Sequence, residues 1–249
     1  MHDEKMLKKL LQKRKVTKNI LMPDIRAYDD GKQQLFIAGP DLCSLAQNII
    51  DETAEHKHLK LAKILLLVRT TEKKKHGRRI GYAAKAKLRE KFLSRYGNSI
   101  IDTIDFVIWL DGDWLAETGG AVNRGHDIKA DNPEGIRKVI GLLDHELLHC
   151  GAKIAGEFVT KQELYQYVSD LGMRHIETVE DESRDDPEEV FVRYYYVNKA
   201  GKLIWKLRKH DIEEFEGAIK RNGKWNDSIG PVVDVIIELD KNLFSKAGK

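Results

Sequence analysis

The sequence predicts an α+β fold in which a small mixed sheet packs on helices. Two runs rich in apolar and β-branched residues, 59–69 and 100–110, predict buried strands. A capped amphipathic stretch at 132–152 predicts a long helix. Two short runs, 191–197 and 202–207, flank the turn sequence Asn-Lys-Ala-Gly and predict a β-hairpin.

The other elements follow in chain order. Residues 1–20 form a basic amphipathic pattern, which predicts a short helix or an arm. We expect the strand at 100–110 to form the sheet edge of a cleft, where an extended peptide can pair. The remaining patterns predict a short strand at 35–38, a helix at 41–53, a loop at 71–81, a basic helix at 82–96, a glycine-rich loop at 114–131, a helix at 157–171, helical spacing from 208 through 219 and a strand at 232–239.

Composition limits the class of protein. The chain has 249 residues, of which 41% are hydrophobic and 33% charged, enough for a folded core under a very polar surface. No apolar run is long enough for a membrane span, and no secretory signal is visible, so we expect no membrane partner. Two cysteines, Cys43 and Cys150, fit a reducing cytoplasm better than a disulfide scaffold. We predict a basic arm at 1–40, a main domain at 41–230, and a C-terminal strand with a basic tail at 231–249.

The net charge is only +3, but basic and acidic residues are concentrated in separate segments of the chain. Residues 57–95 contain fourteen Lys and Arg against two acids, whereas 177–189 contain eight acids against one Arg. A basic block of this kind suits a phosphate backbone or an acidic protein surface, so nucleic acid is one candidate partner. The alternative is a solvated lysine-rich surface, because no nucleic-acid motif accompanies the charge. The acidic run is predicted to be a flexible excursion.

The predicted helix at 132–152 contains the candidate metal-binding and catalytic residues. Asn132 suits the N-cap, Pro133 the first helical position, and Gly151 can end the helix. Within it, His145 and His149 stand four positions apart on one face and can bind one Zn²⁺. Glu146 is then placed to act as general base. The same H-E-x-x-H pattern also arises by chance on ordinary amphipathic helices.

A catalytic zinc usually takes three protein ligands and keeps one position for water. His210 is the first candidate for the third ligand, because it stands where a strand ends and a helix begins. Three further candidates stay open on spacing alone: Glu163, His175 and His126. A metal role for the pair His56 and His58 is a weaker hypothesis, and Cys150 is expected to be a small buried helix residue. The residues considered as oxyanion donors are Tyr194, Tyr195 and Tyr196, each of which suits packing better.

Several stretches together resemble the phage metallopeptidases, a family similar in style to SprT-like zincins. The resemblance covers roughly 59–225 and rests on the strand residues 105–108, Trp114, the helix residues 143–150, Lys-His-Asp-Ile-Glu-Glu-Phe at 209–215 and Arg-Asn-Gly-Lys-Trp at 221–225. It implies a zincin-like fold, with an H-E-x-x-H active-site helix in a metallopeptidase-like domain. It also implies His145, His149 and His210 as zinc ligands and Glu146 as the catalytic residue. The glycine-rich loop at 117–131 and the acidic excursion depart from the family pattern.

These observations predict a zinc metallopeptidase that acts on protein or peptide substrates in the cytoplasm of a bacterial or phage-infected host cell. The phage origin comes from the resemblance alone. A second hypothesis is a nucleic-acid-binding protein, or a protease recruited to nucleic acid, with 57–95 as the contact surface. In the binding-protein form, the zinc site is structural or vestigial. A third is a metal-dependent hydrolase of a non-peptide substrate, which the same ligand set supports.

Overall fold

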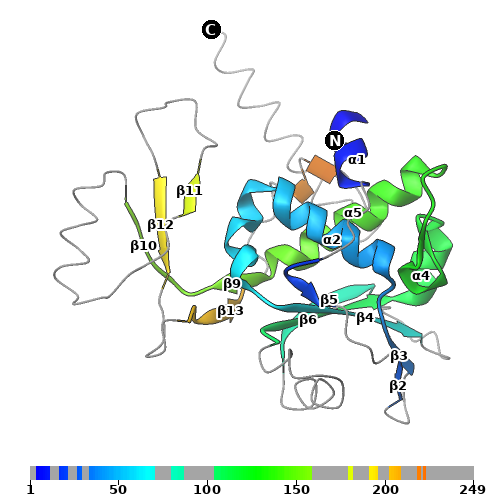
Figure 1. Ribbon diagram of the computed structural model, residues 1–249, viewed down its shortest axis with the longest axis horizontal. Helices are drawn as coiled ribbons and strands as arrows, with labels where there is room; N and C mark the ends of the chain where they lie inside the picture. The colour runs from blue at the N-terminus through cyan, green and yellow to red at the C-terminus, as the bar shows by residue number, and fades with distance from the viewer. Residues whose placement is uncertain are drawn as a thin grey trace, which may run out of the picture.

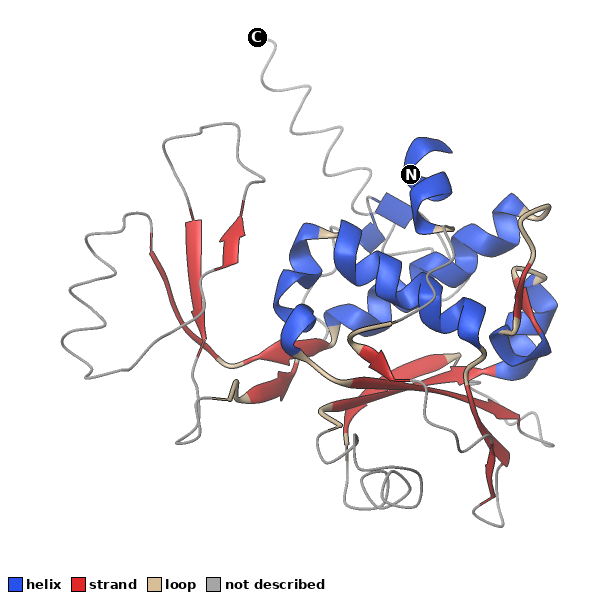
Figure 2. Ribbon diagram, in the orientation of Figure 1, coloured by secondary structure: helices blue, strands red, loops and turns tan. Residues whose placement is uncertain are grey.

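The computed structural model combines a mixed β-sheet with helices, which confirms the α+β class (Figure 2). It describes residues 4–11, 17–21, 27–29, 34–70, 80–86, 104–158, 179–181, 191–195, 202–208, 218–219 and 221–222. Across these residues, no helix is long and apolar enough to cross a lipid bilayer.

The main sheet has six strands. Their order is β2-β3-β4-β6-β5, and β1 pairs with β4 beside this path. The central strands β4 and β6 run parallel, whereas β3 and β5 are antiparallel to their neighbours. The six strands are β1 (Ile20–Leu21), β2 (Ala27–Asp29), β3 (Gln34–Ile37), β4 (Ile64–Thr70), β5 (Gly81–Lys85) and β6 (Phe106–Asp111).

Helices cover one face of this sheet (Figure 1). Alternate residues of β4 and β6 point to that face and join one large core with three helices: α1 (Glu4–Leu10), α2 (Pro40–Glu52) and α5 (Pro133–Leu148). The other face carries a second apolar cluster, in which the rings of Tyr82 and Trp109 stack with centroids 5.7 Å apart. Residues before 41 thus contribute a helix and strands to the main body, while the division into arm, domain and tail stays a prediction.

The predicted helix at 132–152 is α5, and its start is the expected one. The Asn132 side chain accepts a hydrogen bond from the Gly135 backbone N–H at 3.0 Å, and Pro133 occupies the first turn. The helix ends earlier than predicted, because His149 is the C-cap and residues 150–152 form strand β9 (Cys150–Ala152). Cys150 is buried as expected, but in a strand that pairs with β13 (Trp205–Leu207).

Two predictions around the sheet edge are wrong. The strand predicted at 100–110 is β6, which lies between β4 and β5 and is therefore not the edge. The edge strand beside β6 is β5, in a stretch for which a loop and a basic helix were expected. Pairing with β6 from Gly81↔Leu110 to Lys85↔Phe106 holds these residues extended, so tertiary contacts override their helical pattern.

The stretch 114–131 is not a plain loop. The Asp111 side chain accepts hydrogen bonds from the backbone N–H groups of Asp113 and Trp114, which caps a short helix. Gly119 ends that helix with a left-handed φ of 66°. The elements here are α4 (Gly112–Thr118), β7 (Ala121–Val122), the 3₁₀ helix η3 (Asn123–Gly125) and β8 (Asp127–Ile128).

The C-terminal strands pair differently from the prediction. Strand β12 (Phe191–Tyr195) lies between β10 (Ile154–Phe158) and β11 (Val179–Asp181) in a separate sheet, while β13 pairs with β9. The hairpin prediction is therefore wrong, and β10 occupies the start of the helix expected at 157–171. The three-stranded sheet projects to one side of the main body (Figure 1). The strand expected at 232–239 lies outside the described residues.

Candidate metal centre

His145 and His149 lie together at the C-terminal end of α5, both half-buried. Their ring centroids are 4.9 Å apart and the ring planes meet at 87°. One helical turn separates their backbones, as the spacing predicts. Two imidazoles this close can contribute two nitrogen ligands to one ion.

A backbone contact orients the His149 ring. Its Nδ1 lies 2.9 Å from the carbonyl oxygen of Arg208, and the Arg208 N–H donates to the His149 carbonyl at 2.9 Å. A carbonyl oxygen only accepts, so Nδ1 carries the proton and the lone pair of the ring lies on Nε2. Metal-binding histidines are usually oriented in this way, by donating the other ring N–H to a carbonyl or carboxylate. The His149 tautomer therefore fits a metal ligand.

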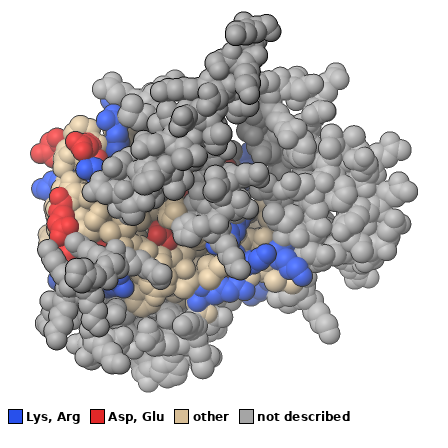
Figure 3. All heavy atoms as spheres, turned by 180° about the vertical axis from the view of Figure 1, so that it is seen from behind, with Lys and Arg blue, Asp and Glu red and all other residues tan. Residues whose placement is uncertain are grey.

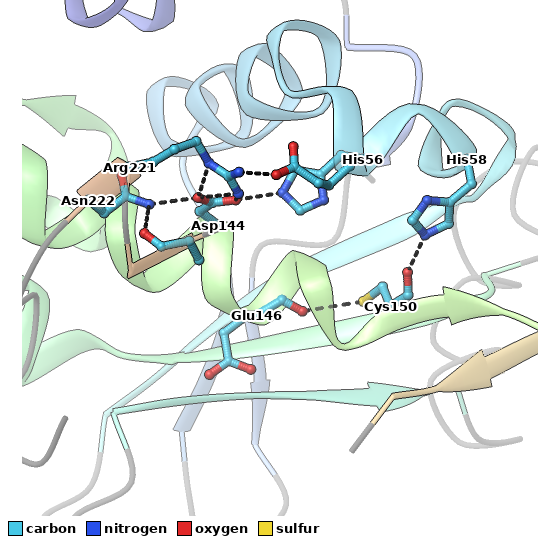
Figure 4. A network of polar contacts seen from close by, with 9 residues as sticks. His56, His58, Asp144, Glu146, Cys150, Arg221 and Asn222 are labelled. Atoms are coloured by element: carbon cyan, nitrogen blue, oxygen red, sulfur yellow. Dashed lines mark hydrogen bonds and ion pairs between the residues drawn. The ribbon is translucent and has the colours of Figure 1, made fainter. Parts of the chain in front are cut away.

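Glu146 lies under the edge strand of the main sheet and is 3% exposed. A Cβ added to Gly81 on β5 would stand 2.8 Å from Glu146 Oε1 and 3.0 Å from Leu142 Cδ1. The absence of a side chain at Gly81 therefore leaves room for the carboxylate between α5 and β5. Glu146 points away from the side of α5 that carries Asp144 (Figure 4).

Asp144, one residue before His145, accepts hydrogen bonds from three side chains (Figure 4). Its partners are His56 at 2.6 Å, Asn222 at 2.6 Å and the guanidinium of Arg221 at 3.1 Å. Burial by itself would raise the pKa of Asp144, but the interactions with these partners outweigh burial and lower the pKa to about 2. Asp144 is therefore a buried carboxylate at neutral pH.

His56 and His58 lie on the 3₁₀ helix η1 (Ala54–Leu61), not on a strand. His56 Nε2 contacts Asp144, and His58 Nε2 lies 2.8 Å from the carbonyl oxygen of Cys150. The rings are 0% and 2% exposed. These contacts give both histidines a structural role behind α5.

Two other residues considered from sequence have packing roles. Tyr195 is 2% exposed and its ring stacks on His58, with centroids 6.0 Å apart. Burial, with the nearby Glu146 carboxylate, raises the pKa of Cys150 well above its ordinary value. The protonated thiol of Cys150 contacts the Glu146 carbonyl oxygen at 3.6 Å. The side chains of Tyr194 and Tyr196 lie outside the described residues.

The third-ligand prediction is not tested by the structure. His210, Glu163 and His175 all lie outside the described residues, and His126 is exposed beside η3. Among the residues that are described, no group of three His, Cys, Asp or Glu side chains could hold a metal ion. The described part of the centre is thus two imidazoles with the Glu146 carboxylate next to them in sequence.

Sequence reasoning missed the buried cluster of Asp144, Arg221 and Asn222. A usable signal was present, because an acid among the apolar residues of a helix needs a buried partner. Arg221 and Asn222 also stand in the last stretch on which the family resemblance rests.

The basic segment at 57–95 is described only at 57–70 and 80–86. On the face shown in Figure 3, described acidic side chains gather along one side and described basic side chains lie across the lower middle.

A family comparison agrees with the resemblance. Residues 172–234 match the family model described as "Putative phage metallopeptidase". The matched segment includes β11, β12, β13, His210, Arg221 and Asn222, and it begins after the H-E-x-x-H helix, which it does not cover. No curated protein and no solved structure matches the chain. The family description supports a metal-dependent peptidase that acts on protein.

Proposed function

We propose that the protein is a zinc-dependent metallopeptidase with a zincin-like site, acting in the cytoplasm of a bacterial or phage-infected host cell. The observation that carries the proposal is the arrangement of His145 and His149 on α5, with His149 Nδ1 donating to the Arg208 carbonyl at 2.9 Å. An orienting contact of this kind puts the lone pair of the His149 ring where a metal ligand needs it.

His210 is the proposed third ligand. Arg208 is fixed at His149 by two hydrogen bonds, and His210 follows two residues later. Two extended residues span at most about 7 Å, so the backbone of residue 210 stays within that distance of Arg208. This short tether to His149 supports His210 as the third ligand. Three neutral imidazoles with an open fourth position form a typical catalytic zinc site.

Glu146 is the proposed general base for peptide hydrolysis. Zinc, when bound, would supply Lewis acidity to a substrate carbonyl and make a nearby water more acidic. Glu146 would take the proton of the attacking water and pass it to the leaving amine. Its position supports this role, because the carboxylate is held between α5 and β5 and directly follows His145 in the chain.

The outer edge of β5 offers a place for an extended substrate. Asp111 N–H donates to the Ile80 carbonyl and Ala86 N–H donates to the Asp105 carbonyl, so even-numbered residues of this stretch bond to β6. In an antiparallel pair the alternate residues, Gly81, Ala83 and Lys85, turn their backbone groups outward. A peptide paired there by β-addition would run alongside Glu146.

The test is a comparison of the Glu146→Gln variant with the unchanged protein. We expect about one zinc per chain in both proteins, and cleavage of an unfolded protein such as casein only by the unchanged one. Gln keeps the shape of Glu but cannot accept a proton, so its effect isolates the general base. Cleavage that survives in Glu146→Gln would remove the proposed role of Glu146, and absence of zinc from the unchanged protein would remove the metal site.

A further inference from the structure

The side chain of Lys85 lies on the same face of β5 as the Glu146 carboxylate. Alternate residues of a strand point to one side, so Gly81, Ala83 and Lys85 share a face. A Cβ added to Gly81 would stand 2.8 Å from Glu146 Oε1, and Ala83 packs against the main core. The register with β6 is continuous through Lys85↔Phe106, so no bulge reverses the alternation. Lys85 therefore points to the side of the sheet that carries the candidate metal centre.

Lys85 is the exposed residue of β5, whereas residues 81–84 are partly buried. Four steps of extended strand place it about 13 Å from Gly81. The Lys85 ammonium is thus a solvated positive charge, set apart from the Glu146 carboxylate. It stands on the edge along which an extended peptide would lie.

A second cation stands at the same end of β5. The ring of Phe106, the residue paired with Lys85, meets the ring of Trp205 on β13 with centroids 5.5 Å apart. Lys206 follows Trp205, is exposed, and by strand alternation points away from this contact. In the described part of the chain, neither Lys85 nor Lys206 forms an ion pair. This end of the edge is therefore positively charged.

We propose that Lys85, assisted by Lys206, is a specificity-determining residue that selects protein substrates with Asp or Glu about four residues from the scissile bond. The inference rests on the proposed function, because it places the scissile bond beside Glu146 and Gly81. A peptide added to β5 sets its side chains next to those of β5 on the same face. The side chain next to Lys85 is then about four residues from the one next to Gly81, and an acid there forms a favourable cross-strand pair.

An acidic peptide fits this edge better than a nucleic acid does. The outward backbone groups of Gly81, Ala83 and Lys85 offer hydrogen bonds that an extended peptide can complete. A nucleic acid would bring phosphates to the lysines but would leave those backbone groups unused. Two lysines also neutralise only about two phosphates, which gives weak and non-specific binding. The charge and the strand edge together favour a peptide.

The experiment compares kcat/KM for matched fluorogenic peptides. A sequence that the unchanged chain cleaves in casein provides the parent peptide. Glu, Gln or Lys is then placed about four residues before or after the scissile bond, because a strand can add to an edge in either direction. On one of the two sides, we expect kcat/KM to be about threefold higher with Glu than with Gln, the size of effect typical of an exposed ion pair. Salt at about 0.5 M should bring this ratio close to one, because it screens exposed charges.

Charge reversal tests the residue directly. In Lys85→Glu the preference should reverse, so that the Lys peptide is cleaved faster than the Glu peptide. Lys206→Glu should lower the preference for Glu by a smaller factor. Lys129→Glu is the matched control and should leave the preference unchanged, because Lys129 is an exposed lysine before the start of α5, about 24 Å of helix away from His145 and His149. A ratio of two peptides is used because a loss of folded protein lowers both rates equally.

Each outcome has a defined meaning. Equal cleavage of the Glu and Gln peptides on both sides would overturn the inference while leaving the proposed function intact. A preference for Glu that Lys85→Glu leaves unchanged would overturn it too. Inhibition by a short single-stranded DNA that is lost in Lys85→Glu, without any preference for Glu, would assign the lysines to nucleic acid instead. Absence of cleavage by the unchanged chain, or cleavage that survives Glu146→Gln, would overturn the proposed function and the inference with it.

Discussion

Gly81 is predicted to set the position of the Glu146 carboxylate, the proposed general base. In Gly81→Ala the new Cβ would stand 2.8 Å from Glu146 Oε1, against an ordinary contact of at least 3.4 Å, so the oxygen must move by 0.6 Å (3.4 − 2.8). The end of a flexible side chain can make this movement at little cost in stability. Catalysis is less tolerant, since a misplacement of about 1 Å can cost about 10²-fold in rate.

We therefore expect kcat for a fluorogenic peptide to fall about tenfold or more in Gly81→Ala, equivalent to about 1.4 kcal/mol or more in the activation barrier. Zinc affinity should stay within twofold, because neither imidazole is touched. Ala84→Ser is the control, since it also adds one heavy atom to β5 but on the opposite face. A Gly81→Ala enzyme with unchanged kcat, or one that loses zinc together with activity, would refute the reasoning.

Three other perturbations have defined outcomes. In Gly151→Ala the new Cβ would lie 2.6 Å from Arg208 Nε, so the Arg208 side chain must move away from Gly151. We expect zinc affinity, measured by chelator competition, to fall several-fold. An unchanged zinc affinity would show that the Arg208 side chain does not influence the metal site. The lowered pKa of Asp144, about 2, adds stability that is present above its ordinary value of about 3.9 and is lost as the pH falls through about 2. The Tm of the metal-free protein should therefore drop between pH 4 and 2, and drop less in Asp144→Asn; equal pH dependence in both would contradict the assignment. Removal of zinc by a chelator should abolish peptide cleavage and lower Tm, and added zinc should restore both, since a ligand of the folded state stabilises it; a chelator-resistant activity would exclude a metal mechanism.

Local signals explain why the H-E-x-x-H helix was predictable. Asn132 and Pro133 start α5 by contacts within its first turn, and the apolar spacing that follows marks the buried face. The helix predicted at 41–53 is α2, which begins and ends one residue earlier than predicted. Elements that are stabilised mainly by local contacts can be predicted from a single sequence.

Elements that depend on residues far away in the sequence could not be predicted from local patterns. A loop was predicted up to Gly81 and a basic helix from residue 82, but pairing with β6 makes residues 81–85 a strand. Strand β13 was predicted to be half of a hairpin, but it pairs with β9. The partners of Asp144 are likewise remote, at His56 on one side and at Arg221 and Asn222 on the other. Nothing in local spacing encodes these contacts, because they form only when the chain folds back on α5.

The central claim is that three histidines bind one zinc ion. The most direct measurement is X-ray absorption at the zinc edge on the purified full chain, together with the same measurement on His210→Ala. We predict about three imidazole nitrogens at about 2.0–2.1 Å in the unchanged protein and two in the variant. An identical imidazole count in the two proteins would contradict His210 as a ligand, and a spectrum without two imidazoles would contradict the site on α5.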